Sequence, residues 1–301
     1  MALPLAHWAG TLAPLQLLPI AVMAIAYERR ARSLAVAGRP VPLWRALCFA
    51  GGIALILVAL VSPAAHIGEE LLLAHMAQHL LLGDLAALLI VLGLTGPILQ
   101  PLLRIRVVDR LRVLAHPAVA LPLWAASLLL WHLAVLYQAA LTSGPVHALE
   151  HGMFLGFGIL MWMPVAGPLP QPSWFGDGAK LIYVIGARAV GAALGNVLIW
   201  SGSVLYPDYA EGERFWNISP LTDQGVAGTI MMVEGSIVTL GVFAWLFLRW
   251  AQRSSESQEL LDYADSRGVE LDAARAERAV AAGHGRRLKE KLRARGSIGE
   301  S

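Results

Sequence analysis

The chain of 301 residues is 57% hydrophobic and only 15% charged, with a formal net charge of +2. Soluble domains carry about 25% charged residues, so this composition excludes a soluble globular protein and indicates an integral membrane protein. The apolar runs are too long for the strands of a membrane barrel, which predicts an all-α fold. The small net charge favours no nucleic-acid partner. The single cysteine, Cys48, excludes an internal disulfide and a thiolate cluster.

Seven apolar segments are long enough to cross about 30 Å of hydrocarbon, which predicts a bundle of seven transmembrane helices. In chain order they cover residues 11–28, 44–63, 71–97, 116–141, 146–167, 179–206 and 220–250. No basic residue precedes the first segment, as it would in a signal peptide, so we expect this segment to remain as a span. We expect a transmembrane domain over 1–250 and a charged cytoplasmic tail over 251–301, whose basic end favours contact with membrane lipid.

The basic residues predict the orientation of the bundle. Five arginines lie between Arg29 and Arg45 in the first loop, four lie between Arg104 and Arg112 in the third, and eleven basic residues lie from Arg249 to Arg295 at the C-terminal end. The second and fourth loops have none. Because basic loops stay in the cytoplasm, we expect the N-terminus outside and the C-terminus inside. The excess of Arg over Lys is typical of a bacterial chain, which places the protein in the bacterial cytoplasmic (inner) membrane as a multi-pass protein.

With this orientation, the histidines of the membrane segments gather in the outer half. His75 and His79 lie four residues apart in the third segment, and His147 and His151 four apart in the fifth, so each pair shares one helix face. A rise of about 1.5 Å per residue places His132 of the fourth segment at a similar depth. Two imidazoles at this spacing can bind one ion, so the five histidines predict a metal site.

Neighbouring side chains modify this expectation. Thioethers are soft ligands that favour cuprous copper, and we expect Met76 of the third segment and Met231 of the seventh to lie near the site. The carboxylates of Glu150 and Asp223 can orient imidazoles from outside the ligand sphere, and His66 precedes the third segment. Neutral imidazole also suits zinc and haem iron, so the residues alone leave the metal open.

A second polar layer is expected deeper in the membrane. Asp84 in the third segment, Arg188 in the sixth and Glu234 in the seventh fall at similar depth. An isolated charge in hydrocarbon is costly, so we expect a buried ion pair between Arg188 and these carboxylates, with a structural role.

Four blocks carry a family resemblance: "LAHMAQHLLLGDLAALLIVLGLTGP", "LWHLAVLYQAAL", "VHALEHGMFLGFGILMWMPVAGP" and "PLTDQGVAGTIMMVEGS". They resemble the signature blocks of the polytopic CtaG family, seven-span bacterial assembly factors for the caa-type cytochrome c oxidase. The matching positions are His75, Met76, His79, Trp131, His132, Leu136, Tyr137, His147, Glu150, His151, Asp223, Gln224, Ala227, Gly228 and Met231. Met232 departs from the pattern, which usually has Trp there.

The resemblance covers roughly residues 10–250 and excludes the tail. It implies a role in oxidase assembly rather than catalysis, with oxidase subunits as partners and with copper bound or delivered. Two alternatives remain open. One is an intramembrane zinc-dependent hydrolase, because Ser62 lies four residues before His66 and a zinc-bound water is a nucleophile near neutral pH. The other is a haem-binding membrane protein with two histidines from facing helices as axial ligands.

Overall fold

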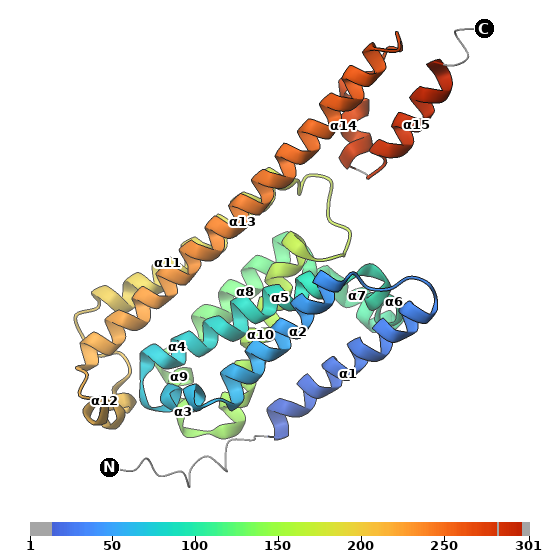
Figure 1. Cartoon of the computed structure of the whole chain (residues 1–301). Coiled ribbons are helices and arrows are strands. Elements are labelled where there is room, and N and C mark those ends of the chain that lie inside the picture. Colours follow the sequence, from blue (N-terminus) through green and yellow to red (C-terminus); the bar gives the residue numbers. More distant parts are fainter. Residues whose placement is uncertain (1–13, 282, 297–301) are drawn as a thin grey trace. The chain divides into compact units, whose positions relative to one another are not determined.

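The structure is a computed structural model that describes residues 14–281 and 283–296, and these residues form helices and turns without a β-strand (Figure 1). Five helices are long and apolar enough to cross a membrane, and a sixth span results if one bent pair of helices is counted as one. The expectation of an all-helical membrane protein is therefore confirmed. The count of seven spans and the orientation stay predictions.

The candidate spans follow the apolar runs of the sequence. They are α2 (Leu43–Val61), the run Leu72–Gly93, α10 (Gly144–Ala166), α11 (Asp177–Trp200) and α13 (Pro220–Asp265). Helix α1 (Pro14–Val36) covers most of the first expected span but is not among these five, because its second half is rich in charge, including "ERRAR". Residues 11–13 of that expected span lie outside the described residues.

The run Leu72–Gly93 is the central span. It consists of α4 (Leu72–Leu80), the π-helical turn η2 (Leu81–Ala86) and α5 (Ala87–Gly93). In the most apolar 18-residue stretch of this run, 61% of the residues are buried inside the protein, compared with 28% for α2. The difference arises because this run packs against both α2 and α10. The polar residues of the third expected segment therefore lie within the protein.

The fourth expected segment, 116–141, is not one helix. Helix α8 (Pro117–Trp131) ends where the backbone of Leu133 becomes extended, and α9 (Ala134–Thr142) begins beyond this break. Before it, the short helices α7 (Arg106–Leu111) and η3 (Arg112–Ala115) meet α8 at 79°. The break places His132 between α8 and α9. An apolar run predicts that a segment is buried, but it contains no signal for such a break.

Glycines allow the central helices to approach closely. A Cβ at Gly158 of α10 would collide with the backbone carbonyl of Gly83 in η2. A Cβ at Gly228 of α13 would likewise collide with the carbonyl oxygen of Gly195 in α11. The backbones are in contact at both crossings, which fixes the positions of the side chains that these helices carry.

Short helices complete the membrane unit. They are α3 (Pro63–Glu70), α6 (Gly96–Leu103), η4 (Pro207–Tyr209) and α12 (Ala210–Trp216). Helix α12 packs on α3, where the indole Nε1 of Trp216 donates to a carboxylate oxygen of Glu70 at 2.6 Å.

The chain divides into two compact units between Ile237 and Val238, within α13. In the second unit, the end of α13 packs with α14 (Ala273–Ala281) and α15 (Gly285–Gly296). Their shared core contains Leu260, Ala264, Ala276, Val280, Leu288 and Leu292. The tail expected over 251–301 thus contains packed helices with their own apolar core.

Candidate metal centre

Helix α4 holds His75 and His79 on one face. The backbone of Leu71 is extended, so the helix begins at Leu72 with free amide groups. The Asp223 carboxylate of α13 accepts hydrogen bonds from the amides of Leu72 at 2.8 Å and Leu73 at 2.9 Å. A carboxylate is favourable at a helix N-terminus, so Asp223 stabilises the start of the helix that carries the first histidine pair.

Helix α10 presents the second pair, with a carboxylate between them. His147, Glu150 and His151 stand at positions i, i+3 and i+4, which lie on the same side of a helix. The rings of His147 and His151 are 4.2 Å apart between centroids, about the separation of 4.3 Å between His75 and His79. Both helices therefore present matching pairs of imidazoles.

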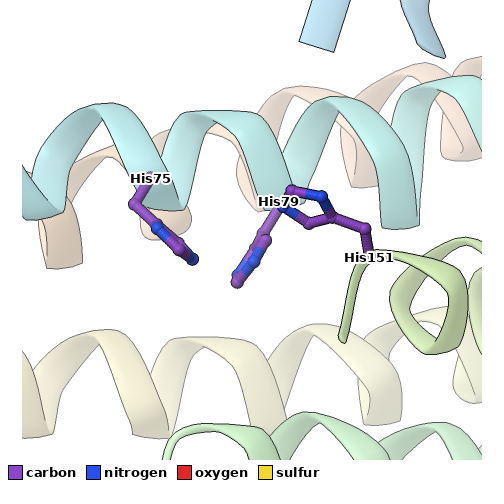
Figure 2. Close-up of side chains that lie close together, drawn as sticks. All are labelled: His75, His79 and His151. Atoms are coloured by element: carbon purple, nitrogen blue, oxygen red, sulfur yellow. The ribbon is translucent and has the colours of Figure 1, made fainter. Parts of the chain in front are cut away.

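The two pairs face each other, one from α4 and the other from α10. The ring of His75 lies 5.4 Å from that of His147, and the ring of His79 lies 5.6 Å from that of His151. Figure 2 shows His75 and His79 on one helix with their rings directed into the space that His151 reaches from the other. Glu150 lies among them, with one carboxylate oxygen 3.7 Å from His75 Nε2 and the other 3.7 Å from His79 Nε2.

Most polar atoms of this cluster are buried without a partner among the described residues. They are His75 Nε2, both ring nitrogens of His79 and of His151, His147 Nε2, and both carboxylate oxygens of Glu150. His75 and Glu150 are 0% exposed. Leaving a polar group unsatisfied in an apolar interior costs roughly 2–7 kcal/mol. Eight such atoms in one place make this cluster a candidate ligand site.

The atoms have the spacing of metal ligands. Two overlapping groups place one ligand atom per residue within 4.8 Å of one another: His75, His79 and His151, and His75, His147 and Glu150. Metal–nitrogen distances near 2.0–2.1 Å put ligand atoms about 3–4 Å apart, so small side-chain shifts suffice. Imidazole nitrogens with one carboxylate suit copper or zinc.

His132 borders the cluster, with its Nδ1 beside a backbone carbonyl and its Nε2 beside a thioether sulfur. Its Nδ1 lies 2.8 Å from the carbonyl of Leu128, and its Nε2 lies 3.3 Å from the sulfur of Met76. Its ring is 6.5 Å from that of His79. The backbone carbonyl of His132, released by the helix break, accepts a hydrogen bond of 2.7 Å from the Tyr206 hydroxyl.

The other expected participants lie elsewhere. The Nδ1 of His66 is 4.0 Å from Glu69 within α3, and His66 belongs to neither group of possible metal ligands. The Asp223 carboxylate bonds to backbone amides rather than to an imidazole. Met231 packs in an apolar group with Met76.

The deeper polar layer contains a buried ion pair. The Arg188 guanidinium forms two hydrogen bonds with the Asp84 carboxylate, and its Nη1 lies 3.7 Å from a carboxylate oxygen of Glu234. The indole Nε1 of Trp162, on α10, donates to Asp84 at 2.8 Å. Trp162 was not predicted as a partner, because an indole in a membrane segment is usually interpreted as a packing residue or an interfacial anchor.

Other polar contacts also escaped sequence reasoning. The Gln224 amide bonds to the backbone of Leu198 and Leu205, and so holds the turn after α11 against α13. The hydroxyls of Tyr137 and Tyr209 lie 2.8 Å apart beside His75. Tyr137 and Gln224 belong to motifs that match the family pattern, but their partners could not be read from the sequence. No motif included Tyr206 and Tyr209, the tyrosines after α11.

Comparison with known proteins gives one match. The family model described as cytochrome c oxidase caa3 assembly factor matches residues 24–253, which is most of the chain. This range contains the histidine cluster and the buried ion pair. No curated protein and no solved structure matches the chain significantly.

Proposed function

Because the chain belongs to the cytochrome c oxidase caa3 assembly factor family, we propose that it serves oxidase assembly by binding copper in the histidine cluster and delivering it. The observation that carries the proposal is the group of buried nitrogen and oxygen atoms on α4 and α10 that have no partner among the described residues. An ion bound there would satisfy one atom from each of three of these residues.

The ligand chemistry favours copper. The donors around His75 are imidazole nitrogens and one carboxylate, and the sulfur of Met76 lies beside His132. Imidazole nitrogen binds copper strongly, and a nearby thioether favours the cuprous state. Zinc would accept the same nitrogens, so the metal must be identified by measurement.

A non-catalytic role agrees with the family and with the placement of the alternative groups. The zinc-hydrolase reading needs Ser62 and His66 at the metal, but the His66 imidazole is near Glu69 rather than in the cluster. A haem would need a slot for its macrocycle between two axial imidazoles. The rings here pack at 4.2–5.6 Å between centroids, which speaks against such a slot.

We place the protein in the bacterial cytoplasmic membrane, with seven spans and the N-terminus outside. The arginine-rich first and third loops support this orientation. The ends of α4 and α10 that carry the histidines then face the outside, where an ion would be received and passed to oxidase subunits.

Copper binding by the purified full-length protein tests the proposal. We expect wild-type protein to retain copper(I) against a chromophoric chelator, whereas His79→Ala should weaken the affinity at least about tenfold, the scale of effect seen around metal ligands. His284→Ala is the matched control, since His284 is an exposed histidine of the tail.

A cellular assay separates copper delivery from packing. In copper-limited cells, oxidase activity should fall with His79→Ala and recover on adding copper, because mass action refills a weakened site. The double variant with His75→Ala should be hardly worse than either single, since both serve one ion. Full activity of both variants, or loss of the protein from the membrane, would refute the copper role.

A further inference from the structure

The protonation of His75 is set by its surroundings. Its Nδ1 lies 3.2 Å from the backbone carbonyl of Gly68. A carbonyl oxygen only accepts hydrogen bonds, so Nδ1 carries the proton and Nε2 keeps the lone pair. Nε2 has no hydrogen-bond partner among the described residues. His75 therefore offers one ligand atom, Nε2.

This single atom is required by both ligand groups. One group combines His75 with His147 and Glu150, and the other combines it with His79 and His151. A nitrogen lone pair binds one metal ion at a time. The two groups therefore cannot be filled together, and they describe two alternative positions for one ion.

The two positions are ordered along the helices. His147 lies one turn nearer than His151 to the start of α10 at Gly144, and His79 lies one turn farther than His75 from the start of α4. His147 is partly exposed, whereas the other four residues of the two groups are buried. The group with His147 is thus the outer position, which an ion reaches first, and the group with His79 and His151 is the inner position.

Glu150 adjoins both positions. Its Oε2 is 3.7 Å from His75 Nε2, and its Oε1 is 3.7 Å from His79 Nε2. An ion moving inward therefore meets the next ligand before it loses the carboxylate. No bond outside the cluster has to break for this movement.

We propose that one copper(I) ion enters at His75, His147 and Glu150 and passes to His75, His79 and His151 by exchanging ligands while it stays bound to His75. The step is a ligand exchange without oxidation or reduction. It rests on the proposed function, because it concerns the path of copper within that site.

Stoichiometry and binding kinetics test the two positions. Purified full-length protein is mixed with copper(I) held by a chromophoric chelator, and capture and release are followed by absorbance. Wild-type protein should bind one ion per chain. His147→Ala should slow capture at least about tenfold and change release little, whereas His151→Ala should leave capture fast and accelerate release at least about tenfold.

Several results would overturn this path. Two ions per chain would show that His75 is not shared, and this measurement requires no variant. Equal effects of His147→Ala and His151→Ala on capture and release would show one undivided site, although copper binding itself would stand. Absence of copper binding by wild-type protein would overturn the proposed function as well. Thermal unfolding of each variant confirms that the kinetic changes occur in folded protein.

Discussion

Asp223 at the start of α13 holds the start of α4 through two hydrogen bonds, the shorter of them 2.8 Å from the amide of Leu72. This contact joins residues 151 positions apart in the sequence and lies one turn before His75. The seventh expected span thereby positions the helix that presents two of the candidate ligands.

Asp223→Ala should loosen the start of α4. The two amides would lose their acceptor, at a cost of about 1–2 kcal/mol as for other helix N-terminal caps. Thermal unfolding in detergent measures this loss, and copper affinity should fall with it. Asp223→Asn retains one acceptor oxygen, so its melting temperature should lie between those of wild type and Asp223→Ala. An unchanged melting temperature for Asp223→Ala would contradict the capping role.

Gly158→Ala should separate α10 from the central span. The added methyl group would collide with the carbonyl of Gly83, and overpacking of this kind costs about 1–3 kcal/mol. Gly156→Ala is the matched control two residues away, because a Cβ there has no heavy atom within 4 Å. We expect a lower melting temperature and weaker copper binding for Gly158→Ala only. Similar melting temperatures for both variants would contradict the close crossing.

Arg188→Met should leave the buried Asp84 carboxylate without its charged partner. Breaking one side of a buried ion pair costs about 3–5 kcal/mol. The double variant with Asp84→Asn removes the unpaired charge and should recover part of the loss, which denaturation of the purified proteins can measure. If the double variant is as unstable as the sum of the single variants, the two side chains do not act as a pair.

Glu213→Gln should stabilise the protein at neutral pH. Burial, and then the charge of Asp223, raise the pKa of Glu213 above that of an ordinary glutamate. The folded protein therefore holds this proton more tightly than the unfolded chain, and stability falls as the pH rises through the folded pKa. A glutamine does not titrate and avoids that loss. The melting temperature of the Glu213→Gln protein should therefore exceed that of wild type by about 1–4 °C near pH 7 and match it near pH 4.

The control for this pH dependence lies on the same helix. Glu211 is exposed on α12, and Glu211→Gln should leave the melting temperature close to that of wild type at both pH values. A Glu213→Gln variant whose advantage persists unchanged at pH 4 would show that the effect does not come from the proton.

Much of the membrane unit could be predicted because hydrocarbon requires long apolar helices with satisfied backbone groups. Apolar length gave α2, the central span, α10 and α11 within a few residues. It could not predict the break at His132 or the extension of α13 to Asp265. The break depends on Tyr206, which satisfies a released carbonyl, and such a contact has no signal in apolar composition.

The candidate site shows the same division. Helical spacing predicted that the two histidines of each pair share one helix face. The orientation assigned from the arginines predicted that both pairs lie at a similar depth in the membrane. The role of Glu150 between the pairs and of Trp162 at Asp84 depends on how α10 is rotated against the central span. A single sequence does not specify that rotation, so Asp223 was expected beside an imidazole and lies instead at the start of α4.

The π-helical turn η2 begins two residues after His79 and contains Asp84, and both of these side chains contact α10. A π-turn contains one residue more than an α-helical turn, and each residue of an α-helix advances its direction by about 100°. Asp84 therefore lies in a part of the span whose rotational phase differs from that of α4, so that the imidazoles and the ion pair can both face α10. Deleting one residue of η2 other than Asp84 would remove this change of phase, and only one of the two polar layers could then face α10.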